Sequence, residues 1–331
     1  MKNNIFVKDY HPVLDIVETQ EAIKSIKKSF EFNLAEELDL VRVSAPLFVD
    51  PNTGLNDNLS GKEKAISFNL LNGQELEIVQ SLAKWKRYAL KKYDLTGLYT
   101  DMNAIRPNEE LDNLHSLYVD QWDWEKVISK EERNLEYLKN TVRLIYRAFL
   151  RTDYYMASRY PALKHNLPNE ITFITAQELL ERYPHLSPKE RENEVTKLYG
   201  AVFLIGIGKA LSDGSIHDAR AADYDDWDLN GDILVWHETL GIALEISSMG
   251  IRVNKESLLR QIEKKGEQFK LEYDYHKQIL NEELPLTIGG GIGQSRLCLF
   301  FLNKAHIGEV QSSYWDKEDI EEFKKYNINL L

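Results

Sequence analysis

The pattern of apolar and polar positions predicts how the first part of the chain folds. Between residues 16 and 38, apolar side chains recur at spacings of three and four, the period of an amphipathic helix: Ile23, Ile26, Phe30 and Leu34. Residues 40–45 instead alternate on a two-residue period, which predicts a strand that ends at Pro46. The next predicted elements are strands at 64–69 and 74–79 and a helix over 81–93.

The rest of the chain mixes strands and helices without strict alternation. In order, it predicts strand, loop and strand over 97–127, a charged helix over 124–160, two helices within 176–199 separated by Pro184 and Pro188, a buried central strand at 201–208, a hairpin over 232–253, a charged helix over 255–284 and a helix over 294–303. We therefore predict the α+β class, with one domain over residues 1–331 built on a mainly antiparallel sheet flanked by helices, and a mostly helical insertion at about 126–200.

Composition narrows the class of protein. The chain of 331 residues can bury a large core without disulfides, and its single cysteine, Cys298, lies in the apolar run RLCLFF, as a buried thiol in a reducing compartment does. The start, MKNNIFVKDYHP, lacks the apolar core of a signal peptide, and no run of about 18 apolar residues occurs. The net charge of −12 disfavours nucleic acid. We therefore expect a soluble, cytoplasmic protein that binds neither nucleic acid nor membranes.

The predicted hairpin brings two carboxylates together. If residues 237–240 form the turn, Asp232 lies directly opposite Glu245, and like charges in such a pair destabilise a sheet. A Mg²⁺ ion carried by the phosphates of a nucleotide would compensate them, and so would a shared proton or a neighbouring arginine. Polar residues that follow on the same strand favour the metal: Ser247, Ser248 and Arg252.

Two further polar groups are candidates for a binding site. In a strand, Gln121, Asp123 and Glu125 share one face, which is either exposed to solvent or lines a site, and Arg106 nearby favours a site. The Asp-rich loop at 212–231 is either solvated or holds Arg220 by ion pairs, in which case one of its aspartates could bind the ammonium group of an amino acid. The histidines lack the spacing of metal ligands and are interpreted as structural: His217, His237 and His306.

A glycine-rich segment, TIGGGIGQSRL, spans residues 287–297. It does not match the dinucleotide-binding pattern, because Arg296 stands where the last glycine belongs, and no Gly-Lys-Ser/Thr of a phosphate-binding loop occurs in the chain. Two interpretations remain: a structural turn or bulge, or a close backbone approach to a ligand at Gly291 and Gly293 with Arg296 beside it.

Several long motifs in register resemble those of the ammonia-dependent asparagine synthetase (aspartate–ammonia ligase) family, over nearly the whole chain. They are NDNLSGKEKA, SLAKWKR, LHSLYVDQWDWE, YDDWDLNGDILVW, LEISSMGIRV and TIGGGIGQSRL. That family shares the catalytic fold of class II aminoacyl-tRNA synthetases, particularly those for aspartate and asparagine. LDLVRVSAPLFVD resembles the first motif of that class, Arg106 the arginine of the second, and GIGQSR the third.

The resemblance implies ATP-dependent amidation of L-aspartate by ammonia, giving L-asparagine, AMP and pyrophosphate through a β-aspartyl adenylate. It implies ATP and Mg²⁺ as cofactors and a homodimer whose contact includes residues 16–48, where Leu40 and Val41 would otherwise be partly uncovered. A class II aminoacyl-tRNA synthetase is the nearest alternative, although it would need an anticodon-binding domain. A non-catalytic paralogue is the other, although every charged candidate position is present.

The resemblance also assigns roles to individual residues. The expected catalytic residues are Asp57, Gln121 and Arg106, with Asp57 as the base that takes a proton from ammonium. Residues expected to bind aspartate are Lys84, Gln121, Asp123, Arg220, Asp225, Ser247 and Arg252. Residues expected to bind ATP are Arg106, Asp232, Glu245, Ser248, Gly291, Gly293 and Arg296, of which Asp232, Glu245 and Ser248 would hold the metal.

Overall fold

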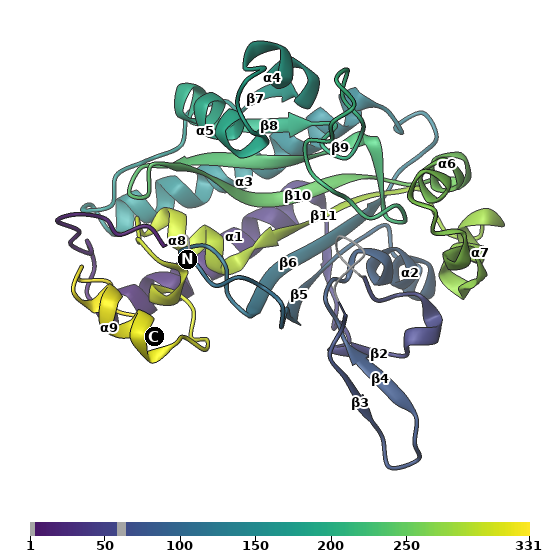
Figure 1. Cartoon of the computed structure of the whole chain (residues 1–331), viewed down its shortest axis with the longest axis horizontal. Helices are drawn as coiled ribbons and strands as arrows, with labels where there is room; N and C mark the ends of the chain where they lie inside the picture. The colour runs from purple at the N-terminus through teal and green to yellow at the C-terminus, as the bar shows by residue number, and fades with distance from the viewer. Residues whose placement is uncertain (1–3, 58–63) are drawn as a thin grey trace.

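A large, mainly antiparallel sheet forms the centre of the molecule (Figure 1). The computed structural model describes residues 4–57 and 64–331, so most of the NDNLSGKEKA motif lies outside the described residues. Within them, eight strands follow the order β1 (Val41–Arg42), β5 (Gly97–Ile105), β6 (Tyr118–Val127), β11 (Thr287–Gly293), β10 (Ile242–Arg252), β9 (Asp225–His237), β8 (Ala201–Ile205), β7 (Thr172–Thr175). Only the outermost pairs, β1 with β5 and β7 with β8, are parallel, which confirms the predicted sheet.

A second, smaller antiparallel sheet projects from the body of the molecule (Figure 1). It consists of β2 (Phe48–Val49), β4 (Glu75–Ile78) and β3 (Ser67–Asn69), and β3 and β4 fall within the strands predicted at 64–69 and 74–79. The strand predicted over 40–46 is shorter than expected. After β1, only the N–H of Val43 still donates to β5, at the Tyr99 carbonyl (2.9 Å), and the chain then leaves the large sheet for the small one.

Two long helices pack on one face of the large sheet (Figure 1). The first, α1 (Ile16–Leu38), has the predicted bounds because Asp15 and Glu18 form a capping box at its start. In α1, Phe30 stacks on Phe149 of α3 (Leu135–Arg159) at 5.0 Å between ring centroids and lies 4.9 Å from Trp122 of β6. Because side chains alternate along a strand, this contact leaves Gln121, Asp123 and Glu125 on the opposite face, as predicted.

Smaller helices complete the fold, and several differ from their predicted bounds. They are α2 (Ala83–Tyr93), α4 (Ala176–Arg182), α5 (Pro188–Tyr199), α6 (Lys255–Lys265), α7 (Asp274–Leu280), α8 (Gln294–Phe301) and α9 (Lys317–Lys324), with short 3-10 helices η1 (Pro51–Thr53), η2 (Gln268–Glu272) and η3 (Ile307–Glu309). The helix predicted over 255–284 is wrong as one piece, because Gly266 ends α6 with a positive φ of 69°. The helix predicted over 124–160 begins later, since the first four of those residues belong to β6.

The segment expected to be a mostly helical insertion at about 126–200 also contains a strand, β7, which extends the large sheet. The strand predicted at 201–208, β8, is consequently next to the edge strand and not central. It is still fully buried, because Val202 and Leu204 pack with α4 while Phe203 packs in the main core on the other face. Among the described residues, no helix is both long and apolar enough to span a membrane.

The glycine-rich segment is a central strand, β11, between β6 and β10, so the interpretation as a turn or bulge is wrong. None of its glycines has a positive φ. A Cβ atom at Gly289 would lie 2.6 Å from Arg252 Nη2 and would also clash with the Glu125 carboxylate, and one at Gly291 would lie 2.8 Å from Asp123 Oδ1. The glycines therefore leave room for charged side chains of the two neighbouring strands.

The hairpin formed by β9 and β10 has a different register from the predicted one. His237 pairs with Ile242, which moves the turn by one residue, and a bulge between Glu245 and Ser247 shifts the register again. Asp232 therefore pairs with Ser248, and Glu245 with Leu234. The prediction that the two carboxylates lie directly opposite each other is wrong.

Adding a methyl group at Gly289 should destabilise the fold. Gly289→Ala would push against Glu125 and Arg252, and overpacking of a core typically costs about 1–3 kcal/mol. The matched control is Gly293→Ala in the same strand, where the nearest atoms belong to the flexible Arg296 side chain at 3.2–3.5 Å. Urea unfolding should show a larger decrease in the free energy of unfolding for Gly289→Ala than for Gly293→Ala. Equal decreases would contradict a steric role for Gly289 in β11.

Candidate active site

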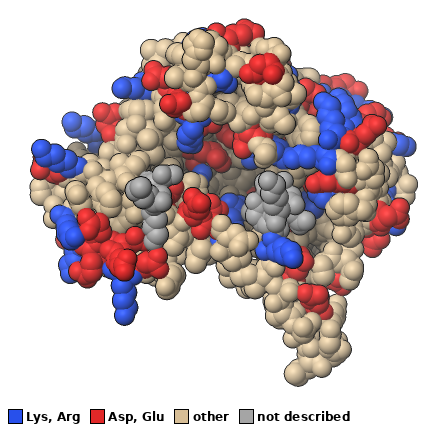
Figure 2. All heavy atoms as spheres, viewed as in Figure 1, with Lys and Arg blue, Asp and Glu red and all other residues tan. Residues whose placement is uncertain are grey.

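A cavity of about 310 Å³ opens on the face of the sheet opposite α1 and α3. Figure 2 shows this hollow near the middle of the molecule, with acidic and basic side chains around it. Twelve of the residues expected from the sequence line it: Asp57, Arg106, Gln121, Asp123, Arg220, Asp225, Glu245, Ser248, Arg252, Gly291, Gly293 and Arg296. The topology thus brings together residues from four neighbouring strands and the loops beside them.

Three expected residues do not line the cavity. Lys84 is buried against Asp223, with 3.1 Å between its Nζ and Oδ2. Asp232 lies behind Arg220, whose Nη2 donates to its two carboxylate oxygens at 2.6 and 2.9 Å. Ser247 is buried, and its hydroxyl has no hydrogen-bond partner among the described residues.

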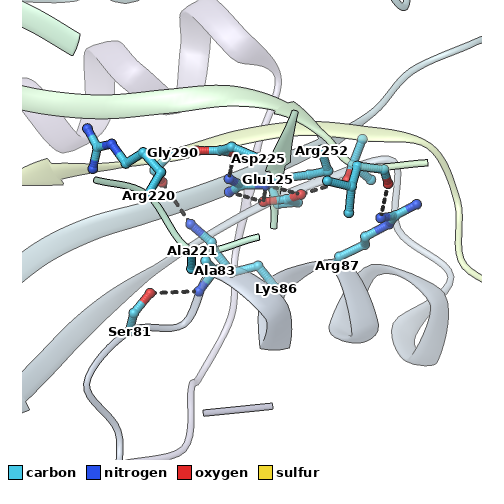
Figure 3. A network of polar contacts seen from close by, with 12 residues as sticks. Ser81, Ala83, Lys86, Arg87, Glu125, Arg220, Ala221, Asp225, Arg252 and Gly290 are labelled. Atoms are coloured by element: carbon cyan, nitrogen blue, oxygen red, sulfur yellow. Dashed lines mark hydrogen bonds and ion pairs between the residues drawn. The ribbon is translucent and has the colours of Figure 1, made fainter. Parts of the chain in front are cut away.

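Lys86 takes the place expected for Lys84. Residues two apart on a helix differ by about 200° in direction, so the two lysines of α2 face different surroundings. The side chain of Lys86 is 1% exposed, and its Nζ donates to Asp123 Oδ1 at 2.8 Å. It also donates to the Gly290 carbonyl at 2.8 Å (Figure 3). Burial lowers the pKa of Lys86, although the Asp123 carboxylate opposes this shift. The motif AKWKR indicated that a lysine of this helix belongs to the site, but the spacing of Lys84 and Lys86 did not show which of the two faces it.

A buried triad of charges, Arg252 with Glu125 and Asp225, lies at the floor of the cavity (Figure 3), and Arg252 and Asp225 line it. Arg252 donates through Nη2 to Glu125 Oε2 at 2.7 Å and through Nε to Oε1 at 2.9 Å, and it also forms an ion pair with Asp225. Burial would raise the pKa of Glu125, but Arg252 and the hydroxyl of Thr287, 2.7 Å away, hold it below its usual value. The pKa of Asp225 is raised by burial despite Arg252.

Two partly exposed arginines lie at the other end of the cavity. Arg296, at the start of α8, donates to the Glu245 carbonyl at 3.0 Å and lies 3.6 Å from its carboxylate. Arg106 follows β5 directly, and its Nη1 lies 4.0 Å from Glu109 Oε2. Weak, partly solvated pairs of this kind leave both guanidinium groups able to turn to an anionic ligand.

The carboxylates Asp232 and Glu245 still interact across the hairpin. Burial and the charge of Glu245 raise the pKa of Asp232 well above its usual value, while Arg220 opposes that shift. Arginines compensate both groups, as one alternative from the sequence proposed. Among the described residues, no group of three or more His, Cys, Asp or Glu side chains could hold a metal. Mg²⁺ needs only one or two carboxylates when a nucleotide supplies the other oxygens, so Glu245 and Ser248 fit such an ion.

Comparison with known sequences gives one family. The family model described as aspartate–ammonia ligase matches residues 17–327. The aspartate–ammonia ligase of Bacillus cytotoxicus is 59% identical over 326 residues, covering 97% of this chain and 100% of the relative. That of Fusobacterium nucleatum is 58% identical over 325 residues, covering 97% and 99%.

Comparison with solved structures gives the fold. Asparaginyl-tRNA synthetase of Entamoeba histolytica, in complex with asparaginyl-adenylate, matches with a TM-score of 0.66 and 15% identity over 91% of this chain and 68% of that chain. The Pyrococcus horikoshii enzyme, also complexed with asparaginyl-adenylate, matches with a TM-score of 0.66 and 16% identity over 89% and 68%. The predicted class II aminoacyl-tRNA synthetase fold is confirmed.

The buried triad makes a prediction about stability and pH. The folded-state pKa of Glu125 lies below 4.5, so its stabilising contribution is complete above about pH 4.5 and is lost as the pH falls through the folded-state value. Glu125→Gln should therefore lower the free energy of unfolding by about 3 kcal/mol near pH 7. The gap in free energy of unfolding between Glu125→Gln and wild type should narrow as the pH falls below about 4.5.

Urea unfolding at several pH values measures this gap. The control is Glu322→Gln, which breaks a solvent-exposed pair with Lys325 and should leave the free energy of unfolding nearly unchanged at every pH. A gap for Glu125→Gln that stays constant down to acid pH would show that its charge does not stabilise the triad.

Proposed function

The chain belongs to the aspartate–ammonia ligase family, and we infer from that membership that it is a ligase that forms a C–N bond between L-aspartate and ammonia. ATP would supply the energy by forming a β-aspartyl adenylate, with AMP and pyrophosphate as the other products. The observation that carries this inference is the identity of 59% over the full length of a named ligase. The cavity supports it, because it lines one space with groups suited to an amino acid and to phosphates.

We propose that the floor of the cavity binds aspartate. The cations Lys86 and Arg252 would pair with its carboxylates, and Asp225 would accept from its ammonium group. Asp123, Arg220 and Gln121 complete the same wall, with Gln121 beside the reacting carbonyl. Lys86 replaces Lys84 in this scheme because it lines the cavity, and Ser247 and Asp232 would act from behind the lining.

The opposite end of the cavity is proposed to bind ATP. Arg106 and Arg296 would neutralise the phosphates as the aspartate carboxylate attacks the α-phosphate, and the backbone at Gly291 and Gly293 allows close approach. Glu245 and Ser248 would hold Mg²⁺, while Asp232 would have to exchange Arg220 for the ion. When bound, Mg²⁺ would stabilise negative charge on the phosphate oxygens.

Asp57 is proposed to take a proton from ammonium in the second half-reaction. It is 2% exposed and lines the cavity, and its backbone is held by Gln80, whose amide donates to the Asp57 carbonyl at 2.9 Å. Free ammonia is the nucleophile at the adenylate carbonyl, so ammonium must lose a proton before attack.

We also propose a cytoplasmic location. The single cysteine of the chain, Cys298, is a buried free thiol, as expected in a reducing compartment.

The products distinguish this function from its alternatives. Purified protein incubated with L-aspartate, ATP, Mg²⁺ and ammonium should form asparagine, AMP and pyrophosphate in equal amounts, because the arginines suit attack at the α-phosphate. Chromatography of the products measures this. ADP in place of AMP would exclude the adenylate, and charging of tRNA without asparagine formation would favour a synthetase.

Replacing Asp57 should separate the two half-reactions. Positioned proton transfer typically contributes about 10²- to 10⁴-fold, so Asp57→Asn should slow asparagine formation by that factor. Aspartate-dependent exchange of labelled pyrophosphate into ATP should persist, because adenylate formation does not need this base. Hydroxylamine, which is neutral near pH 7, should recover more of the rate than ammonium.

The control for Asp57→Asn is Asp50→Asn, which alters a nearby carboxylate that caps η1 and does not line the cavity. This variant should keep both activities. A parallel loss of exchange and amide formation in folded Asp57→Asn would show that Asp57 binds substrate or holds the loop and is not the base.

We also propose a homodimer. Val41 on the edge strand is 53% exposed, and Phe32, Leu47 and Phe48 nearby along the chain are also exposed apolar residues, whereas Leu40 is only 9% exposed and belongs to the core, contrary to expectation. Light scattering should give twice the chain mass, and Val41→Glu should shift it toward the monomer. A monomeric mass for the wild type at micromolar concentration would refute the dimer.

A further inference from the structure

A buried cluster of charged side chains lies outside the cavity and has no role in the proposed reaction. Its centre is the carboxylate of Asp223, and its other members are Lys84, Lys270 and His276. The exposed fractions are 0% for Asp223 and His276, 4% for Lys84 and 5% for Lys270. Burying several ionisable groups is expensive, so their arrangement calls for a structural or functional explanation.

One carboxylate oxygen gathers three groups from three separate elements. Asp223 Oδ2 lies 3.1 Å from Lys84 Nζ of α2, 3.0 Å from His276 Nε2 of α7 and 3.7 Å from Lys270 Nζ of η2. Lys270 Nζ also forms an ion pair with Glu267 Oε2 at 2.8 Å. With a neutral His276, the two lysines and the two carboxylates cancel in charge. Burial would raise the pKa of Asp223, but the two lysines and His276 hold it far below its usual value.

The cluster connects two walls of the cavity. Asp223 belongs to the segment 219–225, in which Arg220, Tyr224 and Asp225 line the cavity. Lys84 is on α2, two residues before Lys86. The pair Lys84–Asp223 therefore ties segment 219–225, which carries Asp225, to α2, which carries Lys86.

The same segment is held a second time, through its backbone. The Gln261 amide of α6 donates to the carbonyls of Ala222 at 3.0 Å and Asp225 at 2.9 Å. Those contacts fix the segment against α6 only. The Asp223 carboxylate joins the segment to α2, η2 and α7.

We propose that Asp223 and Lys84 are positioning residues for the amino-acid end of the cavity. By holding segment 219–225 against α2, they contribute, together with the Arg252–Asp225 and Lys86–Asp123 pairs, to the distance between Asp225 and Lys86, and so to the fit of the aspartate substrate. The nucleotide end, which is lined by Arg106 and Arg296, does not depend on this contact. The inference rests on the proposed function for its substrate but not for its geometry.

Steady-state kinetics of Asp223→Asn, Lys84→Met and the double variant test this role. Small misplacement of binding groups costs up to about 10²-fold, so each single variant should raise KM for aspartate by about 10- to 100-fold. The KM for ATP should change by less than about twofold, because the phosphate-binding end is untouched. The double variant should resemble one single variant, since the two residues act as a unit.

A matched control separates positioning from general destabilisation. Asp153 is also buried, and its Oδ2 accepts from the backbone N–H groups of Asn166 at 3.2 Å and Leu167 at 3.1 Å, away from the cavity lining. Asp153→Asn should lower the melting temperature and leave both KM values unchanged. Should Asp223→Asn not fold, Lys270→Met replaces it and should raise KM for aspartate less strongly.

Hydrogen exchange of the ligand-free protein gives a readout that needs no activity. Backbone amides within 219–225 should exchange faster in Asp223→Asn than in wild type, with no such change in Asp153→Asn. Faster exchange together with an inactive wild type would support the positioning role and refute the proposed function. Unchanged exchange and an unchanged KM for aspartate, or equal increases in both KM values, would overturn the inference.

Discussion

The Arg252 guanidinium, buried between Glu125 and Asp225, is the interaction on which the rest of the site depends. A buried charge is tolerated only when it is paired and hydrogen-bonded, so the strands around it must leave room for all three side chains. The glycines of β11 provide that room, and the aromatic side chains of β6 that face α1 and α3 fix which residues point toward the cavity. The charged floor and the apolar core are thus two faces of the same strands.

Much of the site followed from the sequence because its residues lie in strands with clear alternation. Gln121, Asp123 and Glu125 share a face for that reason, and Arg106 lies where β5 ends. The family resemblance added the proposed roles of residues such as Asp57 and Arg296, whose motifs are long and in register. The α+β class and the bounds of α1 were predictable because their periods are unbroken over many residues.

The errors arose where a local irregularity or the packing of distant segments decides the structure, because neither leaves a mark in the local sequence pattern. The hairpin register changed because of a bulge after Glu245, and no sequence signal marks a bulge there. Lys84 and Lys86 look equivalent in AKWKR, and only the packing of α2 separates them. A turn or bulge stayed open for the glycine-rich segment because the reason for its glycines, the volume of Glu125 and Arg252 on neighbouring strands, depends on contacts distant in sequence.

In the proposed reaction, the cavity holds aspartate with its side-chain carboxylate directed at the α-phosphate of ATP. The most direct test uses aspartate labelled with heavy oxygen in the β-carboxylate. An adenylate transfers one carboxylate oxygen to the nucleotide, because ammonia attacks the carbonyl carbon and AMP leaves with the bridging oxygen. Mass spectrometry of the products should therefore find one heavy oxygen in AMP and none in pyrophosphate. Unlabelled AMP, or label in inorganic phosphate, would contradict the account.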